Sequence, residues 1–140
     1  MEVDVQMQRD PAPSSNEGAG YAAACYALAG RIEQAREVID ELPDRNRYVA
    51  AGIVFNVGHP VADAGDDSSA GPIMELVIDY WPNHYMALYH AAMAEFGLGQ
   101  NDRVRKHLTE FLDLYEANDG WRRNATRVLA RLDAALGEAR

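Results

Sequence analysis

Three glycines, Gly30, Gly65 and Gly99, divide most of the chain into units of similar length, because they are separated by 35 and 34 residues. Small or apolar residues follow each glycine at the same three distances. They are Ala35, Ile39 and Leu42 in the first unit, Ala70, Met74 and Val77 in the second, and Val104, Leu108 and Phe111 in the third. A fixed period of this length is typical of stacked repeats, in which each unit buries its apolar face against the next. The spacing therefore predicts three units that share one core.

Residues 85–115 show most clearly what one unit looks like. Residues 87–96 place Ala, Leu and Phe at helical spacing, and two glycines then end the helix, since glycine readily takes the left-handed conformation of a helix C-terminus. Asn101 or Asp102 is suited to cap a second helix, in which apolar residues recur every three or four positions opposite a charged face. This pattern predicts an antiparallel helical hairpin.

The same periodicity extends over the rest of the chain, where the strict alternation typical of strands is rare. Besides the hairpin, it predicts helices over residues 17–29, 32–42, 45–57, 70–81 and 120–136. Residues 58–69, GHPVADAGDDSS, combine glycine, proline and acids and are predicted to form the longest internal loop. Residues 1–16 have too little apolar surface to offset chain entropy and are predicted to be a flexible tail. The chain is therefore expected to be all-α, with seven helices.

Two stretches carry a more specific pattern: LAGRIEQAREVIDELP at residues 28–43 and YHAAMAEFGLGQNDRVRKHLTEFL at residues 89–112. Here the chain resembles the tetratricopeptide-repeat family, which places small residues in the first helix of each repeat and Ala and an aromatic residue in the second. The resemblance implies a right-handed superhelix of three antiparallel helix-turn-helix repeats plus a C-terminal capping helix, in a single domain over residues 17–140. The middle repeat departs most from the family pattern, because Pro60 falls where its first helix would finish.

Composition and charge argue against several classes of protein. The net charge of −9, from 22 acidic and 13 basic side chains, disfavours nucleic-acid binding, because a phosphate backbone is bound by an electropositive surface. The single Cys25 excludes an intrachain disulfide and, among alanines, is expected to be a buried packing residue. No apolar run reaches the ~20 residues that cross a bilayer, and the N-terminal residues carry acids where a secretory signal carries bases. A cytoplasmic protein without membrane insertion is expected.

No pattern in the sequence predicts catalysis, a cofactor or a metal. His59, His84, His90 and His107 lack the spacing that places two histidine ligands one turn apart on a helix. The acids of residues 58–69 lack the residue order of a calcium loop. Neither a nucleophile with histidine and acid partners nor a glycine-rich phosphate loop is recognisable. We therefore expect a protein that is not an enzyme.

The resemblance also implies a binding surface, because the first helices of such repeats line a concave groove that accepts peptides. Transferred by spacing, this lining comprises Ala24, Ala27 and Leu28 from the first unit, Val49, Ile53 and Asn56 from the second, and Met86, Tyr89, Met93 and Phe96 from the third. Methionine adapts to varied partners and tyrosine adds area with a hydroxyl group, so the expected ligand is a peptide or amphipathic helix of a partner protein.

Arg123 and Arg127 are four residues apart in the last predicted helix and, by the same transfer, point toward the end of the groove. Two like charges at this spacing repel each other, so we expect an acid to lie near them, either from a partner or from the protein itself. Two further alternatives stay open. The protein's own segments fill the groove, or the apolar wall forms a homodimer with no separate peptide ligand.

Overall fold

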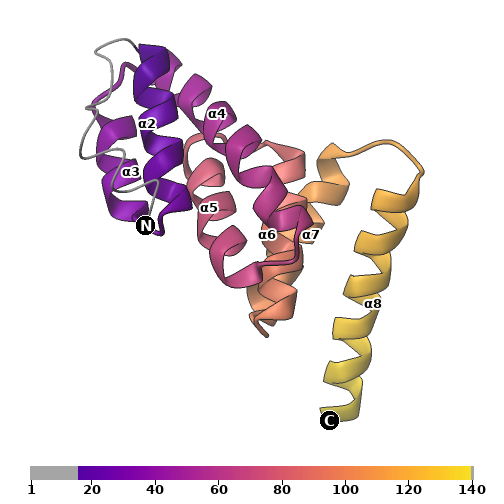
Figure 1. Ribbon diagram of the computed structural model, residues 1–140. Coiled ribbons are helices and arrows are strands. Elements are labelled where there is room, and N and C mark those ends of the chain that lie inside the picture. Colours follow the sequence, from indigo (N-terminus) through magenta and orange to yellow (C-terminus); the bar gives the residue numbers. More distant parts are fainter. Residues whose placement is uncertain (1–15, 140) are drawn as a thin grey trace.

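The computed structural model describes residues 16–139, and every regular element in that range is an α-helix (Figure 1). In chain order these are α2 (Asn16–Leu28), α3 (Ile32–Asp40), α4 (Asp44–Asp63), α5 (Asp67–Tyr80), α6 (Tyr85–Gly97), α7 (Asn101–Leu114) and α8 (Gly120–Ala139). For the described residues, the prediction of an all-α chain with seven helices is confirmed. The predicted tail over residues 1–16 lies outside them, except for Asn16, where α2 begins. Of the helices described, none is both long and apolar enough to cross a membrane.

The three evenly spaced glycines each close one helical hairpin: α2 with α3, α4 with α5, and α6 with α7. Gly30, Gly65 and Gly99 have φ angles of 80°, 79° and 76°, the only positive values among the described residues. In every case the glycine N–H donates to the carbonyl three residues earlier, and the next N–H donates to the carbonyl five residues earlier. This pair of bonds satisfies two of the last carbonyls of the preceding helix. The three turns are therefore built alike.

The predicted loop over residues 58–69 is not a loop, and this prediction is wrong. α4 continues through Pro60 to Asp63, only residues 64–66 connect the two helices, and α5 begins at Asp67. Proline removes one helical hydrogen bond and usually ends a helix, but Pro60 lies on an exposed side of the last turn of α4. Packing of the neighbouring residues outweighs this local preference.

Gly58 shows how α4 comes so close to α5. It is buried, and a Cβ atom on it would lie 2.6 Å from Cγ2 of Ile73, so a side chain at this position would displace α5. α5 then begins with a side-chain cap, since the carboxylate of Asp66 accepts a hydrogen bond from the N–H of Ser69 at 3.3 Å. The glycine and the acids that indicate a loop in the sequence thus serve a helix contact and a helix cap.

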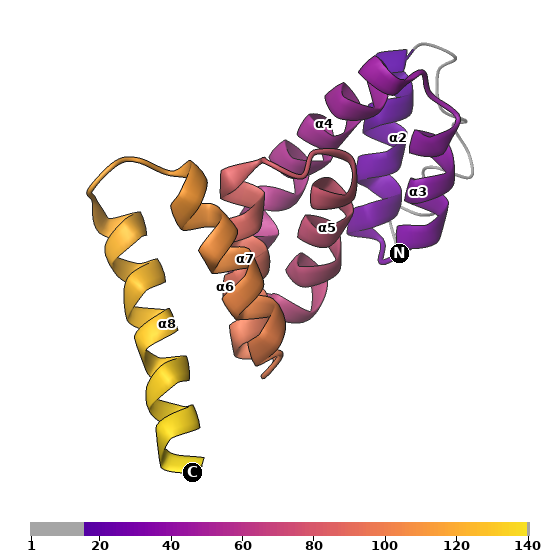
Figure 2. The ribbon, with the colours of Figure 1, turned by 180° about the vertical axis from the view of Figure 1, so that it is seen from behind.

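Helices that follow one another pack in antiparallel pairs, but successive hairpins are not joined in the same way. α4 packs mainly against α2 of the first hairpin, whereas α6 packs mainly against α5 of the second. α8 follows an extended connection and stands beside the third hairpin at the end of the row, where it contacts chiefly α7 (Figures 1 and 2). The buried residues form one core over the first two hairpins, which Ala87 and Ala91 of α6 join, and another over the rest of the third hairpin and α8.

We expect Gly65→Ala to lower the free energy of unfolding by about 1 kcal/mol, because an L-residue is strained at positive φ. No atom outside its chain neighbours lies within 4 Å of the position of the new Cβ, so the cost comes from the backbone alone. Gly137→Ala in α8 also adds a Cβ into open space, but there it gains helix propensity and is expected to be neutral or stabilising. Urea denaturation measures both changes. Unchanged stability of Gly65→Ala would contradict the role assigned to the left-handed turn.

Candidate functional site

The predicted groove residues in the middle of α6 lie against α8. Tyr89 is buried, and the centroid of its ring lies 5.0 Å from that of Trp121. The side-chain amide of Asn124 donates to the Tyr89 hydroxyl at 2.5 Å and lies 3.5 Å from the sulfur of Met93. The first turns of α8 therefore occupy the place where a peptide was expected to contact these two residues.

The predicted groove residues of α4 belong to a different part of the molecule. Ile53 packs into the first core, and a Cβ on Gly20 of α2 would lie only 2.6 Å from its Cδ1. Val49 and Asn56 are exposed on the same helix. This part of the predicted site is therefore split between a core contact and free surface.

Of the other predicted residues, Ala24 and Ala27 are buried in the first core and Leu28 is exposed, whereas the rest lie near the second core. Met86 and Phe96 are half-buried against it, and Arg123 and Arg127 are exposed on α8. The structure thus brings Tyr89 and Met93 of α6 together with α8, and of the α4 residues it places only Ile53 against the first core. For all twelve residues, a role in partner binding stays a prediction.

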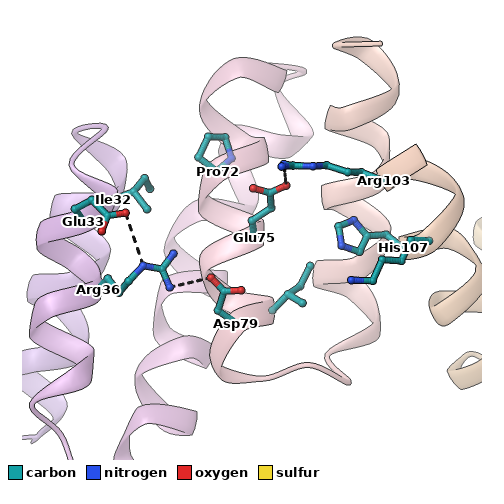
Figure 3. Close-up of a pocket in the computed structure, with 10 residues that line it drawn as sticks. Ile32, Glu33, Arg36, Pro72, Glu75, Asp79, Arg103 and His107 are labelled. Atoms are coloured by element: carbon teal, nitrogen blue, oxygen red, sulfur yellow. Dashed lines mark hydrogen bonds and ion pairs between the residues drawn. The ribbon is translucent and has the colours of Figure 1, made fainter. Parts of the chain in front are cut away.

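A hollow of about 470 Å³ lies between α3, α5 and α7, the second helices of the three hairpins (Figure 3). Binding sites for small ligands in proteins usually have volumes of about 300–1,000 Å³, so this hollow is large enough to hold part of a ligand or of a peptide. We call it the charged groove. Its lining residues are Ile32, Glu33, Arg36, Pro72, Glu75, Ile78, Asp79, Arg103, Lys106 and His107.

Ion pairs cross the charged groove from one hairpin to the next. Nη1 of Arg36 on α3 lies 2.8 Å from Oδ2 of Asp79 on α5, and Nη1 of Arg103 on α7 lies 2.6 Å from Oε1 of Glu75 on α5 (Figure 3). These pairs are partly exposed, so each contributes little to stability, but they hold the side chains on both sides of the groove. Lys106, by contrast, has no hydrogen-bond or ion-pair partner in the part of the chain that the structure describes.

His107 connects the charged groove to a buried carboxyl group. Its Nδ1 donates to Oε1 of Glu95 at 2.6 Å, and the Glu95 side chain is only 1% exposed. The other oxygen, Oε2, has no hydrogen-bond partner among the described residues. Burial has the largest effect on Glu75 and raises its pKa, and the neighbouring Glu95 carboxyl group raises this pKa further. Arg103 lowers it, but the net shift is upward. Two interacting carboxyl groups thus lie between a histidine and a guanidinium.

The charged groove escapes sequence reasoning because its charged residues look like the solvated faces of amphipathic helices. Glu33 and Arg36 belong to such a face of α3, and Arg103 and Lys106 to that of α7. No spacing rule shows that the two faces meet across α5. One local signal does exist: Glu95 continues the apolar stripe of α6 at helical spacing, and an acid at such a position needs a buried partner.

No protein family, curated protein or solved structure matches the chain. The fold itself defines the class, an all-α protein of helical hairpins that pack in sequence. The resemblance to tetratricopeptide repeats stays a prediction.

Glu95→Ala is expected to lower the free energy of unfolding by about 1–3 kcal/mol, because it leaves the Nδ1–H of His107 buried without an acceptor. Glu95→Gln keeps a carbonyl oxygen available to that donor and is expected to retain most of the stability. Glu37→Ala removes an exposed acid of α3 and is the matched control. Urea denaturation at pH 7 compares the three. A loss for Glu95→Ala no larger than that of the control would contradict the hydrogen bond.

Proposed function

We propose that the chain is a non-catalytic scaffold for protein–protein interactions that holds a short segment of a partner protein in the charged groove. Within this class, we further propose a tetratricopeptide-like protein, a right-handed superhelix of three repeats in which α8 is the capping helix. The three identically built turns at intervals of 35 and 34 residues support the repeats. The burial of Ala125, Val128 and Leu132 on one side of α8 supports its role as a cap over the third hairpin.

The observation that carries this function is that Lys106, whose exposed side chain has no partner among residues 16–139, lies in the lining of a hollow that crosses all three hairpins. An ammonium group in such a place gains most from a carboxylate supplied by a ligand. Ile32, Pro72 and Ile78 add apolar surface to the same lining. The partner segment that fits this combination carries an acidic side chain close to an apolar one.

Most of the charged side chains around the groove are already paired with one another. This pairing favours binding over proton-transfer chemistry. The pairs are Arg36 with Asp79, Arg103 with Glu75, and His107 with Glu95. A general acid or base works best when its proton is free to move to a substrate, which such pairing opposes. The groove therefore offers fixed charges that a partner can recognise.

In the charged groove the partner lies on the second helices of the hairpins, although the family resemblance implies a binding surface on the first helices. Tyr89 and Met93 on the first helix of the third hairpin already contact Asn124 of α8. A peptide at that wall would have to displace α8. Binding to the charged groove requires no such displacement.

Selection from a random peptide display library on the immobilised full chain tests the proposed function. The recovered peptides are expected to share an acidic residue next to an apolar one. Lys106→Glu is expected to weaken their binding several-fold, because it replaces an attraction to the acidic residue of the peptide with a repulsion, each worth up to about 1 kcal/mol at an exposed position. Fluorescence anisotropy with a labelled synthetic peptide measures the affinity.

Arg131→Glu is the matched control, because it makes the same change of charge at an exposed position of α8. Equal weakening by both variants would show that only net charge matters, and an unchanged affinity of Lys106→Glu would remove the groove as the site. Light scattering of the same samples tests self-association. A constitutive dimer that recovers no peptide would favour the homodimer over a peptide scaffold.

A further inference from the structure

A second group of polar side chains lies on the first helices of two hairpins, outside the charged groove. His59 and Asp63 occupy successive turns of α4, and His90 comes from α6. Nε2 of His59 lies 3.1 Å from Nε2 of His90 and 3.5 Å from Oδ1 of Asp63. The three ligand atoms all lie within 4.8 Å of one another. Two imidazole nitrogens and a carboxylate oxygen therefore converge on one small volume, which we call the histidine cluster.

The distances in the histidine cluster match those between ligands of one transition-metal ion. Zinc binds imidazole nitrogen at about 2.0–2.1 Å and carboxylate oxygen at about 2.0–2.2 Å, in a tetrahedral arrangement. Two ligands at these distances and at a tetrahedral angle are about 3.3 Å apart. The observed separations of 3.1 and 3.5 Å lie on either side of this value. The helices thus already hold His59 at the required spacing from both other ligands, and the remaining pair, His90 and Asp63, lies within 4.8 Å.

His90 presents a neutral ring to the cluster. Its side chain is only 6% exposed, and burial, reinforced by His59, lowers the pKa of His90 to about 4. At neutral pH the ring therefore has a nitrogen lone pair available. A hydrogen bond between two facing Nε2 atoms uses the hydrogen of one and the lone pair of the other, whereas a metal ion accepts a lone pair from each nitrogen.

Aromatic side chains surround the cluster and restrict its imidazole rings. Phe55, one turn before His59, stacks on that ring with centroids 5.3 Å apart, and the Trp121 ring of α8 lies 6.1 Å from that of His90. His84 is also nearby, but its Nδ1 already accepts a hydrogen bond from a backbone N–H at the start of α6. His59 and the carboxylate are partly exposed, so an ion can reach the cluster from solvent.

We propose that His59, Asp63 and His90 form a binding site for a divalent transition-metal ion. Zinc fits best, because two nitrogens and one oxygen are ligands that it prefers and because three protein ligands leave one position of a tetrahedron for water or another group. The ion ties α4 to α6, two helices that otherwise make little contact with each other. The site is independent of the function proposed for the charged groove.

Zinc titration of the full chain, without a histidine tag and after treatment with a chelator, tests this site. Isothermal titration calorimetry is expected to show one ion per chain, and cobalt in place of zinc is expected to give the visible absorption of a four-coordinate site. His59→Asn is expected to abolish stoichiometric binding. Asp63→Asn is expected to weaken binding at least about tenfold, since even outer ligands of zinc sites contribute 10–100-fold.

Asp113→Asn, which removes an exposed acid of α7, is the matched control and is expected to bind zinc like the wild type. Circular dichroism of each variant checks the fold, and zinc is expected to raise the melting temperature of the control but not that of His59→Asn. Binding of less than one zinc per chain, or wild-type affinity in His59→Asn, overturns the site and leaves an imidazole–imidazole hydrogen bond. Equal affinity for magnesium also overturns it, because magnesium prefers oxygen ligands.

Discussion

The left-handed backbone at Gly30, Gly65 and Gly99 is the constraint on which the rest of the structure depends. Each glycine lets the chain turn back while the last carbonyls of the preceding helix keep their hydrogen bonds, so the second helix returns along the first. Fully buried alanines on α2, α4 and α6 then allow the helices to approach closely. Because the turns are alike, α3, α5 and α7 come to line one hollow, which is the charged groove.

The length of α4 determines how the second hairpin contributes to the histidine cluster and to the charged groove. Because this helix passes through Pro60 and ends at Asp63, His59 and Asp63 lie one turn apart and reach His90 on α6. Gly58, in the same turn, lets α5 lie close against α4. α5 in turn carries acids that pair with arginines on both sides of the charged groove. The continuation of α4 through Pro60, which the usual preference of proline opposes, thus supports both the histidine cluster and the charged groove.

The parts of the fold that follow from local patterns could be predicted from the sequence. Helical periodicity and glycine spacing are local, so seven helices and three turns follow from them. Residues 58–69 could not be predicted in this way, because the deciding contribution is tertiary, the fit of Gly58 against Ile73. Because a loop is predicted for residues 58–69, the sequence does not predict the histidine cluster either, since His59 and Asp63 are one turn apart only if this stretch is helical. No local rule connects them to His90 on a different helix.

The charged groove and the histidine cluster both join the second hairpin to the third. Arg103 on α7 pairs with Glu75 on α5 in the groove, and His90 on α6 meets His59 on α4 in the cluster. The main packing between these hairpins is that of α5 against α6, so the groove contact and the cluster contact both add to a helix pair that already joins the two hairpins.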